Sequence, residues 1–341
     1  MIRYVFRRIA NGVLMLFGIS LLLFILLQAA PGDYLSDLRL NSQISPETVT
    51  ALRAQYGLDQ PLPVRYWKWV KSAAHGDFGY SFAYNVPASA LLWPRARNTL
   101  LLSFPAVLLS WLIAVPLGVL VAGSRWRWVD RLFSAGTSTL LALPDVLIAL
   151  LALLVALKTG LFPVGGMSSS AGDQPGAWAT LRDLLWHMAL PVAALVIGLL
   201  PMILRHVRAG VAEILDSTFM RAAEGHGLPR MKLLFRYALP AAANPLISLF
   251  GLSIALLLSV SLLIEVVMGW PGMGPLLLES ILSRDLFVVI GAVLLSTVFL
   301  LAGNLLGDIL LYSLDPRIRS SVKSQAKRGN PMGNTSLEVH E

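Results

Sequence analysis

Residues that could carry out catalysis are sparse in this chain, and they lie far apart. The sequence contains no G-x-x-x-x-G-K-[ST] phosphate loop, no H-E-x-x-H zinc helix and no G-x-S-x-G nucleophile elbow. It has no cysteine, which excludes thiolate metal sites and cysteine nucleophiles. The five histidines are scattered: His75, His187, His206, His226 and His340. The pattern therefore predicts a protein that is not an enzyme and has no metal or cofactor of its own.

Acidic side chains within apolar runs are the stronger candidates for function. Asp145 follows Pro144 in the middle of one run, where an insertion cost of about 2.5–3.5 kcal/mol requires a carboxylate to face protein or water. It is a candidate for lining a translocation path or, alternatively, for a structural or subunit contact. Glu265, near the outer end of another run, would hold the turn that follows or contact substrate. Asn304 and Asp308 share a helical face and are expected to bond neighbouring helices.

The elements that must position these residues are membrane-spanning helices. The chain of 341 residues is 56% hydrophobic and 13% charged, whereas a soluble protein carries about a quarter charged residues. Its apolar runs are long enough to cross a hydrocarbon core of about 30 Å, and in lipid such runs must be helical. The expected fold class is an all-α polytopic membrane protein with six transmembrane helices, at residues 9–30, 98–122, 132–157, 188–204, 240–267 and 286–312.

The distribution of basic residues predicts the orientation of these helices. The first run is too long for a signal-peptide core and is expected to remain as an uncleaved helix. With the N-terminus inside, the cytoplasmic segments 1–8, 123–131, 205–239 and 313–341 hold 17 of the 27 Lys and Arg residues. This bias follows the positive-inside rule and accounts for the net charge of +8 without a nucleic-acid partner. Both termini are therefore expected in the cytoplasm.

The long segment between the first two helices is expected to form a helical subdomain on the outer face. Ser45 and Pro46 favour the start of one helix, and Pro63 favours the start of a second. The expected domains are an N-terminal transmembrane helix at 1–30, the outer subdomain at 31–97, the transmembrane core at 98–315 and a flexible polar tail at 316–341.

The polar loop 205–239 is the most informative segment of the chain. Residues 219–226 can form two helical turns, which Gly227 would end. Within them, Ala222 and Ala223 are small enough to let a partner approach closely. A short rigid helix between two spans favours a docking surface for a protein in the aqueous phase, and the alternative is a cytoplasmic hairpin without a partner.

This loop resembles the EAA loop of ABC importer permeases, specifically the B-type subunits of dipeptide, oligopeptide and nickel transporters. The family pattern is roughly E-A-A-x-x-x-G, nine residues and I-x-L-P, and here it reads R-A-A-E-G-H-G, nine residues and Y-A-L-P. Peptide-type members commonly have Arg at the first position, whereas Gly225 and His226 depart from the usual small and basic pair. In the family this helix fits a groove on the ATP-hydrolysing subunit. The resemblance implies these ATPase-coupling residues: Arg221, Ala222, Ala223, Glu224, Gly227, Leu239 and Pro240.

Further segments match the B-type subunits in the same order along the chain. They are residues 56–61, 76–81, 265–274, 284–285 and 315–319. The 265–274 segment is similar to the family's E-x-x-F-x-W-P-G-L-G, with Met268 where Phe is usual. Asp145 departs from the family, which has an apolar or aromatic residue near this position. The resemblance implies an outer-face gate or a binding-protein contact at Glu265, Trp270, Pro271, Gly272 and Gly274.

The resemblance implies a type I importer permease in the bacterial cytoplasmic (inner) membrane. Its implied partners are membrane lipid, a second homologous permease, two ABC ATPase subunits that bind ATP and Mg, and an extracytoplasmic substrate-binding protein. The implied substrates are di- or oligopeptides, with nickel or another small solute as the alternative. An ion-coupled secondary transporter would instead carry acids in several spans or inverted repeats. The sequence shows no internal repeat, and the docking-like loop 205–239 also counts against a secondary transporter. A membrane-embedded enzyme would need clustered His, Asp or Ser at membrane depth, and no such cluster is found in the sequence.

Overall fold

The computed structural model describes residues 2–29, 47, 50, 51, 54, 59–169 and 176–314. Within these ranges the regular secondary structure is helical, apart from a short antiparallel hairpin of β1 (Tyr80–Ser81) and β2 (Val86–Pro87). The helices are α1 (Ile2–Ala29), α4 (Leu62–Ala73), α5 (Ala88–Ala122), α6 (Arg127–Ala142), α7 (Asp145–Thr159), α8 (Ala177–Leu215), α9 (Thr218–Gly225), α10 (Arg230–Lys232), the π-helix η1 (Leu233–Ala238), α11 (Leu239–Ala241), α12 (Ala243–Val267), α13 (Met273–Leu282) and α14 (Leu286–Leu314). The expected helix start at Ser45 and Pro46, the 56–58 and 315–319 motif residues and the tail 316–341 lie outside the described residues.

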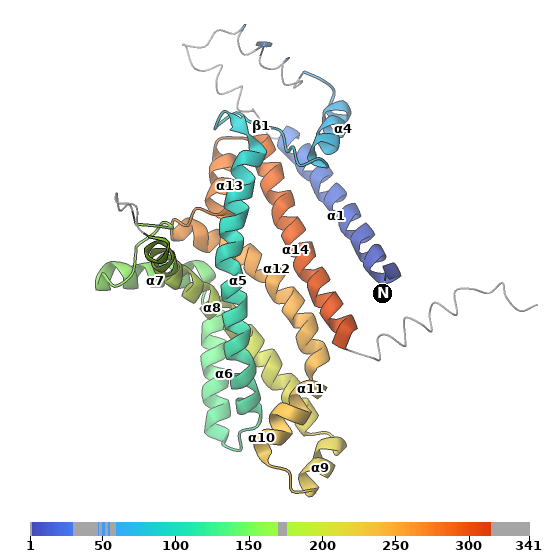
Figure 1. Ribbon diagram of the computed structural model, residues 1–341, viewed down its shortest axis with the longest axis vertical. Coiled ribbons are helices and arrows are strands. Elements are labelled where there is room, and N and C mark those ends of the chain that lie inside the picture. Colours follow the sequence, from blue (N-terminus) through green and yellow to red (C-terminus); the bar gives the residue numbers. More distant parts are fainter. Residues whose placement is uncertain are drawn as a thin grey trace, which may run out of the picture.

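Among the described residues, five helices are each long and apolar enough to cross a membrane, namely α1, α5, α8, α12 and α14, and the bent pair of α6 and α7 makes a sixth span if it is counted as one. They form the long axis of the molecule in Figure 1. Several extend past the expected spans: α8 has 39 residues and continues to Leu215, so residues 205–215 belong to a helix and not to a loop. The reason is that hydropathy detects only the lipid-facing part of a helix, whereas backbone hydrogen bonding continues into the polar region.

The third expected span, 132–157, is not one continuous helix. α6 ends at Ala142, α7 begins at Asp145, and the two helices are bent by 94°. Pro144 is the cause, because proline disfavours helical backbone in the residue before it, and Leu143 is extended with φ −80° and ψ 126°. Asp145 therefore lies in the first turn of α7, at the break between the two helices, and not in the middle of one continuous helix. Figure 1 shows α7 projecting sideways from the bundle.

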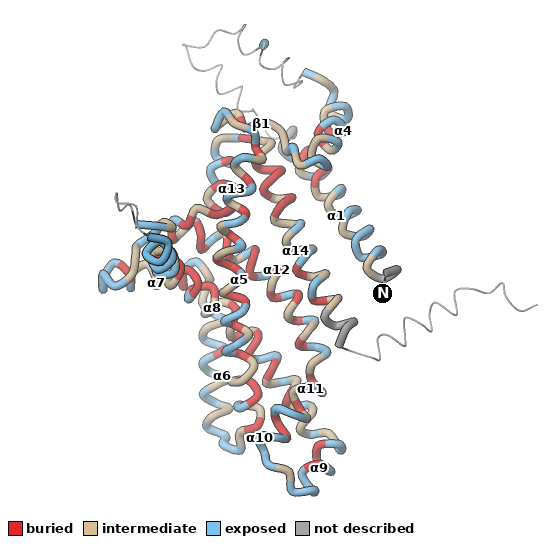
Figure 2. Tube along the Cα trace, viewed as in Figure 1, coloured by how far each residue is buried: buried red, intermediate tan, exposed pale blue. Residues whose placement is uncertain are grey.

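The core lies between α5, α8 and α12, whose facing sides are buried in Figure 2, whereas much of α1 is exposed. Small residues allow the closest helix approaches. A Cβ placed on Gly118 of α5 would lie 2.7 Å from Cγ1 of Val207 in α8. A Cβ on Gly307 of α14 would lie 2.8 Å from the Cα of Gly251 in α12. These glycines set the distances between the central helices.

An ion pair joins α1 to α14. The Nε atom of Arg8 lies 2.5 Å from Oδ2 of Asp308, whose side chain is largely buried. The expectation that Asp308 bonds a neighbouring helix is therefore confirmed. The other side chains that line the space between these two helices are mainly apolar, so the ion pair is a polar contact within a largely apolar interface.

The end of the molecule that carries α4 and the hairpin, called the outer end below after its expected location, is held together by buried polar contacts. The Nε1 group of Trp69 in α4 donates to the carbonyl of Phe78, at 2.9 Å. Asp285, just before α14, accepts from Oγ of Ser81 at 2.5 Å and from the backbone N–H of Ala83 at 3.2 Å. Burial raises the pKa of the Asp285 carboxyl. The hairpin between α4 and α5 is thus fastened to the start of the last span.

Candidate functional site

Residues 216–238, called the α9 loop below, connect α8 to α11 at the lower end of Figure 1. Ser217 is the N-cap of α9, and its hydroxyl accepts from the backbone N–H of Met220 at 3.3 Å. Met220 is fully buried and Ala223 is 9% exposed, so one face of α9 packs on the core. The expected two-turn helix at 219–226 is confirmed as α9, Thr218–Gly225.

The opposite face of α9 is open to solvent. Arg221, Ala222 and Glu224 are exposed, as is the aromatic ring of Phe219 at 55%. The two neighbouring alanines therefore differ: Ala222 faces outward, whereas Ala223 contacts the chain's own core. The small surface available to a partner is centred on Ala222, between two side chains of opposite charge.

Gly227 ends the helix as the sequence predicts. Its φ is +71°, in the left-handed region that favours glycine, and its N–H donates to the carbonyl of Glu224 at 2.9 Å. A Cβ at this position would meet no atom within 4 Å. The requirement for glycine therefore comes from the backbone turn and not from crowding within this chain.

The second half of the α9 loop is not one regular α-helix. Its middle widens into the π-helix η1, with Leu233, Leu234 and Ala238 buried. Pro240 follows, and it has no N–H to donate to the carbonyl of Arg236, which disturbs regular α-helical bonding there. Of the two final motif residues, Leu239 is half-buried and Pro240 is exposed.

The α9 loop is fastened to the turn that follows α5. The guanidinium Nη2 of Arg230 donates to the carbonyl of Gly123, the C-cap of α5. A Cβ on Gly123 would lie 2.5 Å from Cδ1 of Leu234. The loop and the α5–α6 turn are therefore in direct contact, and neither can move far without the other.

At the other end of the molecule, residues 270–274 form the outer-face turn between α12 and α13. Glu265 is fully buried, and its Oε2 accepts from the backbone N–H of Gly274 at 2.7 Å. Its backbone carbonyl accepts from the N–H of Trp270 at 2.9 Å. A Cβ on Gly272 would overlap the Glu265 carboxylate, and one on Gly274 would overlap the carbonyl of Leu262. The glycines thus permit backbone to pack directly on α12.

Two residues of α5 complete the outer-face turn, and neither was predicted from the sequence. The Nε1 group of Trp270 donates to the carbonyl of Asn98 at 3.0 Å, while Nδ2 of Asn98 donates to the carbonyl of Pro271 at 2.8 Å. The hydroxyl of Thr99 accepts from the N–H of Met273 at 2.8 Å. Trp270 is fully buried, and its ring anchors the turn inside the protein. These contacts join positions more than 170 apart in the chain, so no local pattern signals them.

Asp145 lies away from both of these regions. It is half-buried in the first turn of α7, and its Oδ1 would be 2.8 Å from a Cβ on Gly198 of α8. A hollow of about 360 Å³ adjoins it, lined by residues 140–145 and Gly198. In the described ranges, no group of three His, Cys, Asp or Glu side chains is placed to hold a metal ion.

Comparison with known families matches nearly the whole chain. The family model described as the binding-protein-dependent transport system inner membrane component matches residues 114–320, which is more than half of the sequence. The model for the N-terminal part of the same membrane component matches residues 1–102.

Relatives of similar length carry the same type of description. The chain is 32% identical over 320 residues to the oligopeptide transport system permease protein AppB of Bacillus subtilis (strain 168), covering 93% of this chain and 99% of that protein. It is 31% identical over 338 residues to the dipeptide transport system permease protein DppB of Escherichia coli (strain K12), covering 94% and 99%. It is 30% identical over 340 residues to the nickel import system permease protein NikB of Staphylococcus aureus (strain N315), covering 99% and 96%.

The fold has a counterpart among solved structures. A chain of the MetNI methionine ABC transporter in an inward-facing conformation superposes with a TM-score of 0.50 at 18% identity, covering 66% of this chain and 96% of that chain. This likeness concerns the fold alone. Together with the family models and the relatives, it shows that the chain belongs to the binding-protein-dependent transport system inner membrane components, the permeases of ABC importers of the peptide and nickel type, and is a multi-pass inner-membrane protein.

Proposed function

We propose that this chain is one permease subunit of an ATP-driven importer that carries di- or oligopeptides across the cytoplasmic membrane. Support for peptides comes from AppB and DppB, which are named for oligopeptide and dipeptide transport and align over nearly their whole length. The single structural observation that carries the proposal is the construction of α9. One face is fixed on the core by Met220 and Ala223, while Ala222 and its charged neighbours face solvent.

In the proposed complex, a second homologous permease completes the pathway, and two ABC ATPase subunits bind ATP and Mg. The exposed face of α9 enters a groove on one ATPase, and both termini lie in the cytoplasm. An extracytoplasmic binding protein delivers substrate at the opposite end, where the outer-face turn and Glu265 form part of an outer gate. Asp145 is the candidate for the translocation path, because a carboxylate beside an open hollow suits contact with water or a polar solute.

The α9 loop can transmit movement in two directions. Along the chain, α10, η1 and α11 lead directly into α12, whose far end carries Glu265 and the outer-face turn. Across the fold, Arg230 and Leu234 contact Gly123 at the end of α5. When ATP brings the ATPases together, a shift of α9 would reach both helices. The size of the response is limited by the difference in contacts between the two states.

Nickel, alone or as a complex, is the second candidate substrate. The observation that favours it is the alignment with the nickel import permease NikB, which covers 96% of that protein. Uptake measurements with labelled dipeptide and with radioactive nickel, made on the same cells, decide between the two substrates.

The proposed coupling role is tested by placing a large side chain on the outward face of α9. The chain is co-expressed with its ATPase and second-permease candidates and purified through a tag in mild detergent. We expect Ala222→Trp to lower the amount of co-purified ATPase at least tenfold, because the ring would fill the space that a partner occupies. Ala74→Trp is the matched control, since Ala74 is also exposed but lies at the outer end. ATPase retained by Ala222→Trp with normal uptake would contradict the coupling role.

A further inference from the structure

The α5–α6 turn, residues 123–128, has an unusual surface. Arg125, Trp126, Arg127 and Trp128 follow one another in the sequence, and all four side chains are exposed. The two tryptophans are 67% and 59% exposed, although burial of such rings would be strongly favourable. An exposed apolar patch of this size, flanked by charge, indicates a contact with something outside the chain.

The length of α5 places this turn at a membrane surface. Residues 99–122 contain no Asp, Glu, Lys or Arg, and at about 1.5 Å per residue this stretch is about 36 Å long. A hydrocarbon core is about 30 Å thick. The helix therefore emerges from lipid close to Gly123, and the arginines and tryptophans lie in the headgroup region. Tryptophan is enriched at this depth, because its ring is apolar and its N–H is polar.

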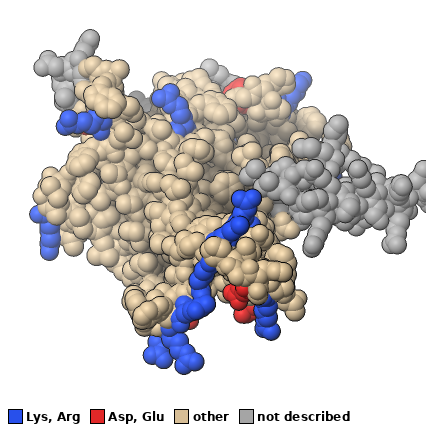
Figure 3. Space-filling model, turned by 60° about the horizontal axis from the view of Figure 1, so that its bottom comes forward, with Lys and Arg blue, Asp and Glu red and all other residues tan. Residues whose placement is uncertain are grey.

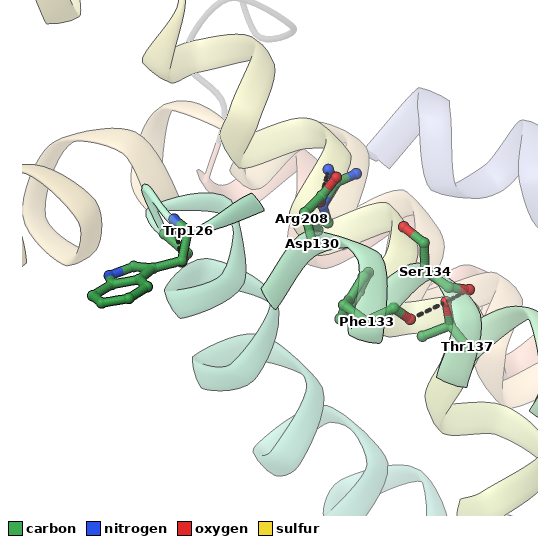
Figure 4. Close-up of polar contacts among 7 residues, drawn as sticks. Trp126, Asp130, Phe133, Ser134, Thr137 and Arg208 are labelled. Carbon is green, nitrogen blue, oxygen red and sulfur yellow. Dashed lines mark hydrogen bonds and ion pairs between the residues drawn. The ribbon is translucent and has the colours of Figure 1, made fainter. Parts of the chain in front are cut away.

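The charge at the turn is not neutralised by the protein. Asp130, in the first turn of α6, forms an ion pair with Arg208 of α8, and the Arg208 guanidinium lies 5.7 Å from the centre of the Phe133 ring. Figure 4 shows Arg208 and Asp130 meeting, with Trp126 pointing away from them. Arg125, Arg127 and Arg131 are exposed, and in the part of the chain that the structure describes no ion pair is found for them.

The turn is also ordered in the conformation that exposes these side chains. The hydroxyl of Ser124 accepts from the backbone N–H of Trp126 at 3.2 Å, and the carbonyl of Trp126 accepts from the N–H of Val129 at 3.1 Å. The rings of Trp126 and Trp128 lie edge to face, with centroids 6.3 Å apart. Lys and Arg side chains cross the end of the molecule that comes forward in Figure 3, which is the lower end of Figure 1.

We propose that the α5–α6 turn is a binding site for anionic phospholipid, in which Arg125 and Arg127 bind headgroup phosphates and the two tryptophans lie among the glycerol and upper acyl groups. Guanidinium groups match phosphate oxygens in pairs, which favours Arg over Lys in this role. Each arginine near an anionic lipid surface strengthens binding about fivefold. The chemistry thus selects phosphatidylglycerol or cardiolipin over neutral lipid.

The site also has a mechanical consequence, which rests on the proposed function of α9. The carbonyl of Gly123, one residue before Ser124, accepts from Arg230, and Leu234 packs on the same glycine. Because the α9 loop contacts this turn, a lipid bound there would restrain the loop relative to the membrane plane. Anionic lipid would then not only bind at the turn but also be needed for efficient coupling of ATP hydrolysis to transport.

Lipid binding is measured on the purified full-length chain in nanodiscs of phosphatidylcholine with increasing phosphatidylglycerol. Bound lipid is counted by native mass spectrometry, and depth is read from quenching of tryptophan fluorescence by brominated phosphatidylglycerol. We expect Arg125→Gln/Arg127→Gln to weaken phosphatidylglycerol binding about 25-fold, because two fivefold contributions are lost. Lys158→Gln/Arg182→Gln is the matched control, since it removes two exposed positive charges elsewhere on the chain.

The outcomes separate this proposal from the coupling role. Equal phosphatidylglycerol binding by the two double variants would overturn the lipid site, whatever the ATPase does. Lost ATPase binding by Arg125→Gln/Arg127→Gln in lipid-free detergent, with lipid binding unchanged, would instead make the turn a protein interface and would also overturn it. Weakened lipid binding with normal coupling would support the site and refute only its mechanical consequence.

Discussion

The outer-face turn and the α9 loop lie at opposite ends of the molecule, and each carries motif residues of the same family. In the outer-face turn, Trp270, Gly272 and Gly274 are buried and are bonded or packed against α5 and α12. On α9, Arg221 and Ala222 are exposed, and only the opposite face of the helix packs on the core. The difference shows that one family's motifs can specify internal packing at one place and an exposed surface at another. Substitutions at the two places should therefore fail in different ways.

The largest effect is expected at the outer-face turn. In Gly274→Ala the new Cβ would overlap the backbone carbonyl of Leu262, which cannot move away as a flexible side chain could. We expect a loss of about 3 kcal/mol or more in the free energy of unfolding, seen as poor yield and a much lower Tm in detergent. Gly225→Ala is the control, because a Cβ there meets nothing within 4 Å. Equal Tm values for the two variants would contradict the view that the outer-face turn is more tightly packed than the α9 loop.

A smaller change in stability, but a large loss of function, is expected in the α9 loop. Gly227→Asp adds a charge beside the exposed face of α9 and strains a backbone with φ +71°, which costs about 1–2 kcal/mol. We expect normal membrane insertion, with ATP hydrolysis no longer linked to uptake in proteoliposomes. Gly160→Asp controls for the backbone strain, since Gly160 has φ +61° and equally open surroundings. Normal coupled uptake by assembled Gly227→Asp complexes would refute the role of this turn.

The smallest effect is expected at Asp145, which belongs to neither region. Asp145→Asn keeps the shape of the side chain and removes its charge beside the hollow of about 360 Å³. We expect a Tm within about 1 °C of the unmodified protein and a changed preference among dipeptides of different charge in uptake assays. Asp59→Asn, on the outer surface, is the control. Unchanged preference with lost complex assembly would place Asp145 among the structural contacts.

The sequence predicted those features of the fold that depend on local composition. Apolar length predicted α1, α5, α8, α12 and α14, and the residue types around Gly227 predicted a helix with a glycine end. The bend at Pro144 was missed because hydropathy measures the length of a run and not its direction. Proline in the interior of α5 leaves that helix continuous, so a proline alone does not predict a break.

The residues that hold the candidate sites in place were harder to predict than the site residues themselves. Glu265 was recognised as a candidate to hold the outer-face turn, but the residues of α5 that bond the turn, Asn98 and Thr99, have no distinctive sequence pattern. The inward orientation of Ala223 depends on the angle at which α9 meets the core. Adjacent alanines look the same in the sequence, and only packing distinguishes them.

The break between α6 and α7 has a consequence for how the chain is made. At such a break, the last carbonyls of one helix and the first N–H groups of the next lack partners within their own helices. Lipid cannot supply those hydrogen bonds, so protein or trapped water must do so. A newly inserted copy in which neither protein nor water covers the break would therefore be unstable within the bilayer. Such copies would be expected to be cleared by membrane proteolysis.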